Sequence, residues 1–222
     1  MCAFSLLVKF LSDLQPLIFL TQLALHILRE CLHVPTNIPH YMKTDCDKIV
    51  QCFTNSADSD IRISSIFILS YIECKLSAKQ RHHLRMQEKD VQIVLDELSK
   101  SVLTYSICSS PTSLLRDMQS VIVAEQENAE TFFSKGILST MSEVLASSDS
   151  NVQMETIILI WKLISTPLFI EKVKAQSDLV PAIQRLQISD CSPDLNLAIT
   201  CVLWDITGER SSGKIIALIL NT

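Results

Sequence analysis

Glycine is scarce in this 222-residue chain, which contains only three. Average proteins contain about 7% glycine, and sheet sandwiches and phosphate-binding α/β folds depend on it for tight turns. Positive charge is also limited, because 19 basic residues face 24 acidic ones and the net charge is -5. Nucleic-acid binding needs Lys and Arg to neutralise phosphates. The composition therefore favours a helical fold and argues against nucleic acid as the partner.

The chain also lacks an apolar run long enough to span a membrane. The uncharged stretch 14–28 contains Gln15, Thr21, Gln22 and His26 and is shorter than the roughly 18 residues that a span needs. Lys9 and Asp13 cancel in charge before it, which is a poor start for a signal peptide. We therefore expect no membrane span and a cytoplasmic location.

No cysteine pattern indicates a metal site. Cys46 and Cys52 are six residues apart, and the neighbouring His82 and His83 point to different sides of a helix. We expect no bound metal. Four of the eight cysteines lie in apolar helical stretches, where we expect buried free thiols: Cys31, Cys74, Cys108 and Cys201.

What the sequence does contain is helical periodicity along most of its length. Apolar residues recur at spacings of three and four, which predicts a series of helices. Short polar breaks separate these blocks, and their Asp and Ser side chains can cap the next helix. The breaks are 33–39, 54–60, 109–113, 147–151 and 188–194.

The helical blocks repeat. Trp161 and Trp204 are 43 residues apart in similar apolar helices, 152–165 and 195–207. A short helix (128–136) and a second helix (137–147) precede the first of these, with Gly136 at their junction, where a left-handed backbone suits glycine. Paired aliphatic residues mark the long helices at steps of 44, 49, 42 and 43: Leu25 and Leu28, Leu69 and Ile72, Met118 and Val121, Ile160 and Leu163, Leu203 and Ile206.

This layout of two shorter helices and one long buried helix resembles the armadillo repeat. The third-helix pattern is carried by Val152, Thr156, Ile160 and Leu163, and again by Leu195, Ile199, Leu203 and Ile206. The resemblance implies an all-α, right-handed α-α superhelix (solenoid) of about four repeats, with no sheet. We expect the repeat domain to cover 1–207, with degenerate helices in 1–40, and an irregular tail in 208–222.

A closer likeness is to the helical region that precedes the TIR domain in invertebrate armadillo-TIR proteins. It is carried by the segments 61–77, 88–103, 132–145 and 199–206. The chain then continues to Thr222 without the strand-and-helix series of a TIR domain. We therefore expect no catalytic residues, no cofactor and no enzymatic activity, and one interpretation is a truncated product whose TIR domain is downstream or acts in trans.

The likeness to peptide-binding armadillo proteins gives candidate partner-binding positions. In those proteins an Asn between the paired third-helix aliphatics holds the peptide backbone, and a Trp lines the groove. The Asn is absent here, and each Trp stands one residue before the slot, so the tryptophans fit either the groove or the core. The candidate residues are Tyr71, Ser120, Lys162 and Asp205 in the slots, with Trp161 and Trp204 beside them.

Two further motifs have simple interpretations. Residues 208–214 match the spacing of a phosphate-binding loop, but Ile215 replaces the Ser or Thr that holds magnesium and no strand precedes the loop, so we expect an irregular tail. The basic run 75–85 is interpreted as a solvated turn, or alternatively as a patch for an acidic segment.

The leading hypothesis is a non-catalytic protein-protein interaction scaffold, in TIR-type innate-immune signalling by family likeness. The alternative is a structural or autoinhibitory arm of a truncated TIR-domain signalling protein. A small enzyme or ligand-binding helical domain is a third class, but the sequence offers no convergent ionisable groups for it. The sequence does not identify the partner, the oligomeric state or the pathway.

Overall fold

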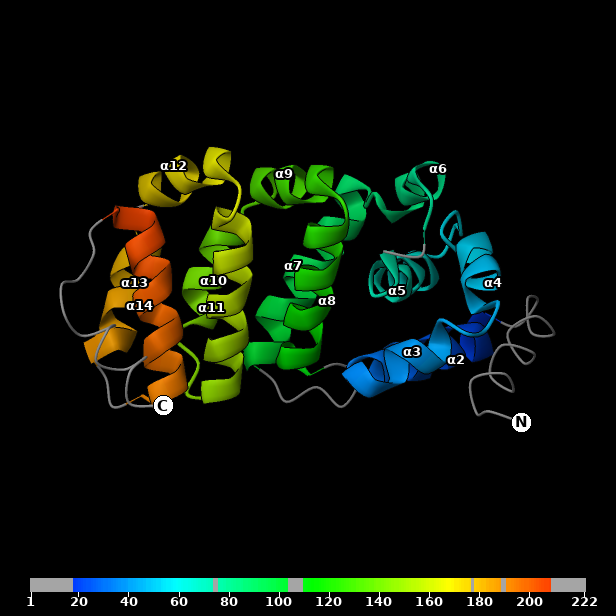
Figure 1. Cartoon of the computed structure of the whole chain (residues 1–222), viewed down its shortest axis with the longest axis horizontal. Helices are drawn as coiled ribbons and strands as arrows, with labels where there is room; N and C mark the ends of the chain where they lie inside the picture. The colour runs from blue at the N-terminus through cyan, green and yellow to red at the C-terminus, as the bar shows by residue number, and fades with distance from the viewer. Residues whose placement is uncertain (1–17, 74–75, 104–109, 177, 189–190, 209–222) are drawn as a thin grey trace. The chain divides into compact units, whose positions relative to one another are not determined.

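A computed structural model describes residues 18–73, 76–103, 110–176, 178–188 and 191–208 (Figure 1). This part of the chain contains helices and turns and no strand. It divides into two compact units, each assembled from separated stretches of sequence. Unit 1 comprises 1–93 and 116–131, and unit 2 comprises 94–115 and 132–222. Each of three described helices has residues assigned to both units: α7 (Glu88–Leu103), α8 (Pro111–Ala124) and α9 (Gln126–Ser134).

Unit 1 is built around α5, a helix buried on almost every side. Its apolar residues occur on more than one side of the helix, and both α2 and α4 pack against it. Leu69 and Ile72 are fully buried in this core, together with Leu25 and Leu28 of α2. The helices of unit 1 before α7 are α2 (Ile18–Leu32), η1 (Pro35–Asn37), α3 (Ile38–Tyr41), α4 (Cys46–Phe53), α5 (Ser59–Ser70), α6 (Ala78–Arg81) and η3 (His82–Leu84).

Two buried polar side chains connect segments of unit 1. Asn128 of α9 donates from its amide to the carbonyls of Leu84 and Val121 and accepts from the backbone N–H of Met86. Arg62 of α5 donates from Nε to Asp90 of α7 at 2.8 Å, and both side chains are buried. Buried polar groups are tolerated where their hydrogen bonds are made, as they are here.

Unit 2 contains the repeat most clearly. After α9, the chain forms α10 (Ile137–Val144) and the long α11 (Ser150–Ile164), and then α12 (Pro167–Ala175), α13 (Leu179–Ile188) and α14 (Pro193–Thr207). The two long helices, α11 and α14, pack against each other, and α13 packs against α14. Two shorter helices followed by one long helix is the order that the sequence predicts, and the order is confirmed.

The predicted core pairs are buried with one exception. Ile160, Leu163 and Ile206 are at most 2% exposed, as the spacing predicts. Leu203 is only half-buried. It lies on α14, the last helix of the described residues, so no described helix follows α14 to cover this position.

Capping side chains confirm three of the predicted helix starts, and the predicted turn is confirmed, whereas η1 and α3, which start within the break 33–39, have no side-chain cap. The side chains of Asp58, Asp149 and Ser192 each accept hydrogen bonds from backbone N–H groups in the first turn of α5, α11 and α14. Gly136 joins α9 to α10 with φ of 87°, the left-handed region that glycine adopts without a steric penalty.

The predicted burial of the cysteines is wrong in part. Cys31 and Cys201 are half-buried rather than buried, because each lies at the edge of its helix's apolar face. Cys46 is buried and Cys52 is exposed. Cys74 and Cys108 lie outside the described residues, as does the tail after Gly208. The division into a repeat domain of 1–207 and a tail stays a prediction, although α14 does end at Thr207.

Candidate interaction surface

The candidate surface lies on the two long helices of unit 2. On α11, Met154, Ile158, Trp161 and Lys162 are not buried and recur at spacings of three and four, so they share one face of the helix, with the half-buried Glu155 beside Met154. Shifting these positions by the 43-residue repeat gives positions on α14 that are also not buried. We call this set the α11–α14 face: Met154, Ile158, Trp161 and Lys162, with Leu197, Cys201, Trp204 and Asp205.

One hydrogen bond joins the two helices on this face. The indole N–H of Trp161 donates to Oδ2 of Asp205 at 2.9 Å. Trp161 remains 48% exposed, so the bond fixes the orientation of a large aromatic surface that water still contacts. Trp204 is half-buried. The structure therefore places Trp161 on the surface rather than in the core. The exposure of Trp204 is intermediate between that of a surface residue and that of a core residue.

Burial shifts the ionisation of two groups on this face. Desolvation lowers the pKa of the half-buried Lys162 ammonium, although Glu155 opposes the shift. Desolvation, with a further contribution from the Asp205 charge, raises the pKa of the Cys201 thiol. A raised thiol pKa disfavours the thiolate, which is the reactive form of Cys201. The face thus presents apolar and aromatic groups together with the charged side chains of Lys162 and Asp205.

The sequence pattern predicts only part of this face. Trp161, Lys162, Trp204 and Asp205 were predicted, but the apolar positions one and two turns earlier were not. The signal for them was available, because a shift of 43 residues relates Met154 to Leu197 and Ile158 to Cys201.

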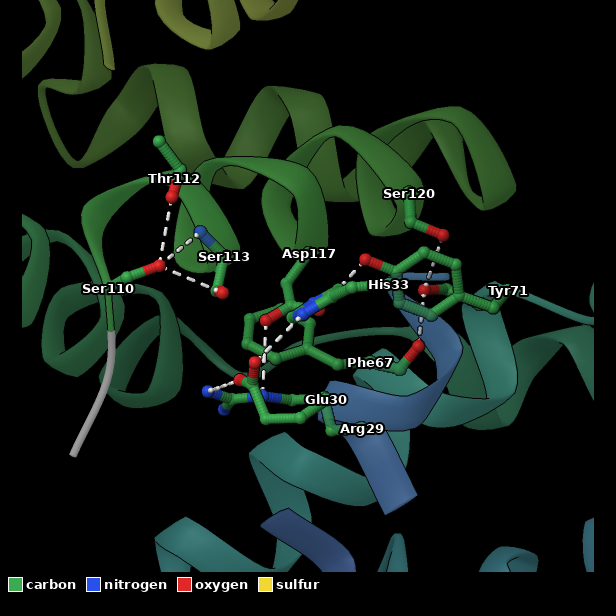
Figure 2. Close-up of polar contacts among 11 residues, drawn as sticks. Arg29, Glu30, His33, Phe67, Tyr71, Ser110, Thr112, Ser113, Asp117 and Ser120 are labelled. Atoms are coloured by element: carbon green, nitrogen blue, oxygen red, sulfur yellow. Dashed lines mark hydrogen bonds and ion pairs between the residues drawn. The ribbon is translucent and has the colours of Figure 1, made fainter. Parts of the chain in front are cut away.

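Tyr71 and Ser120, the other two predicted residues, lie in unit 1 and make internal hydrogen bonds. The hydroxyl of Tyr71 donates to Oδ1 of Asp117 at 3.0 Å, and Ser120 accepts from the hydroxyl of Ser70 at 2.9 Å. Figure 2 shows both residues beside a buried ionic cluster that the sequence analysis missed. A role for Tyr71 and Ser120 in partner binding stays a prediction.

The buried ionic cluster consists of Arg29, Glu30, His33 and Asp117. Asp117 is completely buried, and Nε2 of His33 lies 2.9 Å from its Oδ1 (Figure 2). Nε of Arg29 lies 3.2 Å from the second carboxylate oxygen of Asp117, Oδ2. Neither of these two atoms has a hydrogen-bond partner among the described residues, so the contact is an ion pair without a hydrogen bond. Two helices that are far apart in sequence, α2 and α8, are therefore connected by charge. No sequence signal marks this pairing, because His33 and Asp117 are 84 residues apart.

His33 in this cluster is positively charged at neutral pH. Burial of the ring opposes its charged form, but hydrogen bonds to Asp117 and Glu30 and the charges of both carboxylates outweigh burial. Together they raise the pKa of His33 to about 9. The hydrogen bond from His33 lowers the pKa of Glu30 to about 2, against a smaller opposing effect of burial. Both ring nitrogens of His33 then donate, one to each carboxylate.

These shifts predict how stability depends on pH. The raised pKa of His33 stabilises the fold fully below pH 6.5, and the effect is lost as the pH rises through about 9. The lowered pKa of Glu30 stabilises the fold above pH 4.5, and the effect is lost as the pH falls through about 2. From pH 6.5 to 9 we expect His33 to account for a loss of about 2–3 kcal/mol in urea denaturation. The His33→Gln variant should lack that loss, and an equal loss in the variant would contradict the assignment.

The basic run is partly neutralised by carboxylates. Arg85 forms an ion pair with Glu127 at 2.7 Å, and Arg81 lies 3.7 Å from Glu73. Burial, with the neighbouring His82, lowers the pKa of His83. Lys75 lies outside the described residues. The interpretation as a solvated turn accounts for the contacts that the structure describes.

The described residues contain no cluster of three His, Cys, Asp or Glu side chains that could hold a metal ion. In the same part of the chain, no helix is both long and apolar enough to cross a membrane. The 208–214 motif lies outside the described residues except for Gly208.

Comparison with known proteins gives structural likeness only. No protein-family model and no curated protein matches the chain. An engineered protein of known crystal structure is 18% identical with a TM-score of 0.57, and the match covers all of this chain and 85% of that one. A second engineered protein is 16% identical with a TM-score of 0.53, and this chain spans 61% of its length. A designed armadillo repeat protein is 13% identical with a TM-score of 0.49, over 90% of this chain and all of that one.

The order of the helices defines the class of fold. The part of the chain that the structure describes is all-α, and its helices recur in the order of an armadillo-like α-α repeat, as the sequence predicts. None of the comparisons tests the likeness to armadillo-TIR proteins, which stays a prediction.

Proposed function

We propose that this chain is a non-catalytic protein-interaction scaffold, and that a partner segment binds to its α11–α14 face. The observation that carries the proposal is Trp161, which is 48% exposed and held in place by Asp205. Tryptophan is enriched among the residues that dominate binding energies, and an oriented side chain loses less entropy on binding. Stacked helical repeats offer extended surfaces of the kind that protein partners use.

The chemistry of the face indicates what kind of segment it binds. Its side chains between Trp161 and Met154 are apolar, and the equivalent stretch of α14 adds Leu197 and Cys201. A partner segment with apolar side chains would bury this surface, at about 25 cal/mol for each square ångström removed from water. We place this binding in the cytoplasm and, by family likeness, in TIR-type signalling. Under the alternative, a structural or autoinhibitory arm, the partner on this face is a TIR domain.

Capture from native lysate tests the scaffold, with matched variants. We expect Trp161→Ala, alone or with Trp204→Ala, to lose specific proteins that the unaltered chain retains, by about 30-fold for a residue worth 2 kcal/mol. The control is Leu168→Ala on α12, which removes a side chain that is 59% exposed but lies off the face. Circular dichroism should be unchanged for Trp161→Ala, because this side chain is largely outside the core.

Two results would contradict the proposal. Equal recovery of the same proteins by Trp161→Ala and Leu168→Ala would show that the face binds none of them. Turnover of a nucleotide by the purified chain would show that it is an enzyme. Titration of the chain with a purified TIR domain tests the alternative, and the absence of binding would exclude a TIR domain as the occupant of the face.

A further inference from the structure

The outer side of α2 carries a row of exposed apolar side chains, which we call the α2 stripe. It consists of Phe19, Leu23 and Ile27, which are 73%, 45% and 42% exposed and recur at a spacing of four residues. Because successive helical residues are about 100° apart, the stripe points away from Leu25 and Leu28, which α2 buries in the core of unit 1. Large apolar side chains that are exposed together, rather than singly, indicate a contact surface.

The stripe is uncharged, which allows two copies of the same chain to meet there. The net charge of -5 makes copies repel each other elsewhere. Residues 18–28 include no Asp, Glu, Lys or Arg. Burial and the neighbouring Arg29 lower the pKa of His26 from its ordinary value, which favours the neutral ring. The next acid on this side of α2, Glu30, forms an ion pair with His33 at 3.2 Å. Two stripes can therefore approach without like charges facing each other.

The lack of exposed basic residues on α2 argues against a lipid surface as the occupant. Helices that lie on membranes carry Lys and Arg along their polar side, where these residues attract anionic lipids. Apart from His26, the basic residue of α2 is Arg29, and it is buried. The chemistry of the stripe therefore fits an apolar protein surface, and the stripe itself is such a surface.

The spacing of the stripe matches the commonest way in which two helices pack. Residues four apart form a ridge, and helices whose ridges of this kind interdigitate cross at about 50°. Crossing helices touch over a short length, and α2 rises only about 12 Å from Phe19 to Ile27. A two-fold axis at the middle of the stripe brings the two copies of Leu23 together, with Phe19 and Ile27 of both copies on either side. Apolar side chains then meet apolar side chains throughout the contact.

The exposed area sets the strength of this contact. At roughly 200 Å² for a fully exposed large side chain, the stripe presents about 300 Å² of apolar surface on each copy. Interfaces of standard size bury about 800 Å² on each partner and bind with micromolar to picomolar affinity. The stripe is therefore the apolar centre of a small interface, for which we expect a dissociation constant on the order of 100 µM.

We propose that two copies of the chain associate through the α2 stripe into a weak dimer with two-fold symmetry. The stripe belongs to unit 1 and the α11–α14 face to unit 2, so the dimer does not rest on the proposed function. If the proposed function also holds, the dimer carries two α11–α14 faces and binds two partner segments at once. Two connected faces raise the apparent affinity for a partner that contains two such segments.

Sedimentation of the full-length chain, over a concentration range centred on about 100 µM, measures the dimer. We expect a monomer at the low end and a dimeric mass at the high end. Leu23→Glu places two negative charges at the two-fold axis and should raise the dissociation constant at least about tenfold. The matched control is Val123→Glu, which adds the same charge at another exposed apolar position of unit 1 and should leave the constant unchanged. Circular dichroism of both variants should match that of the unaltered chain.

Opposite charges at Leu23 give a second measurement that a failure to fold cannot imitate. Leu23→Lys alone should weaken the dimer as Leu23→Glu does. An equimolar mixture of the Leu23→Glu and Leu23→Lys variants should recover a dimeric mass, because the two-fold axis brings these two side chains together. A mixture of Val123→Glu with Leu23→Lys should not recover it.

A chain that stays monomeric well above the expected dissociation constant would overturn the proposal. A dimer that Leu23→Glu leaves intact, or a mixture of the Glu and Lys variants that stays monomeric, would also overturn it. Co-sedimentation of a monomer with phosphatidylcholine vesicles, lost in Leu23→Glu, would assign the stripe to a lipid surface instead. These measurements contain no partner protein, so their failure leaves the proposed function standing if Trp161→Ala still loses captured proteins.

Discussion

Alanine in place of Asp117 is expected to lower the free energy of unfolding by about 3–5 kcal/mol, a large part of the stability of a typical domain. Asp117 is completely buried, and it is the shared anion for Arg29, His33 and the hydroxyl of Tyr71. Without it, the buried Arg29 keeps its positive charge and loses its closest counter-ion. The loss should be measured by urea denaturation at neutral pH, followed by circular dichroism.

The control for Asp117→Ala is on the same helix. Val123 of α8 is 59% exposed, so Val123→Ala should change stability by no more than about 0.5 kcal/mol. Asp117→Asn keeps the size of the side chain and removes its charge, and we expect it to be destabilising but less so than alanine. If Asp117→Ala cost no more than Val123→Ala, the ionic cluster would not be a stabilising feature of the fold.

The second large effect is expected at the buried pair of Arg62 and Asp90. Arg62→Met and Asp90→Leu should each cost about 3–5 kcal/mol, since either change leaves one charge buried and uncompensated. Arg62 also donates to the carbonyl of Ser56 and the hydroxyl of Ser59, so the guanidinium connects the start of α5 to α7. Thermal and urea denaturation of both single variants measure the loss.

The double variant separates charge from packing. Replacing both partners with apolar side chains removes the uncompensated charge, and such replacements are often close to neutral. We therefore expect the Arg62→Met, Asp90→Leu double variant to be more stable than either single variant. Losses that simply add in the double variant would show that the two side chains do not interact.

The elements of this fold that depend on local sequence could be predicted, and the contacts between distant residues could not. Asp149 and Ser192 cap their helices, and Gly136 turns the chain, because each acts on backbone within a few residues. The meeting of His33 with Asp117 depends instead on how α2 packs in the folded unit. Periodicity identifies the apolar face of a helix, but it does not identify which distant helix will cover that face.

Trp161 illustrates the same limit at the candidate surface. Its sequence, in the run IILIW, fits a core position as well as a surface position, and the two interpretations could not be separated. The structure separates them through Asp205, whose carboxylate accepts from the indole and holds it at the surface. The 43-residue repeat predicted that Trp161 and Trp204 would be equivalent, but not that Trp161 would donate a hydrogen bond to Asp205, the residue after Trp204.

The division of the chain into two units has a consequence for any attempt to separate them. Unit 1 ends with residues 116–131, and unit 2 begins with 94–115, so their sequences alternate along the chain. No single cleavage of the backbone separates the two units whole, because any cut between residues 1 and 131 divides unit 1 and any cut between residues 94 and 222 divides unit 2. A protease that nicks the chain once between residues 94 and 131 divides both units, so the two fragments should stay associated and neither should refold alone.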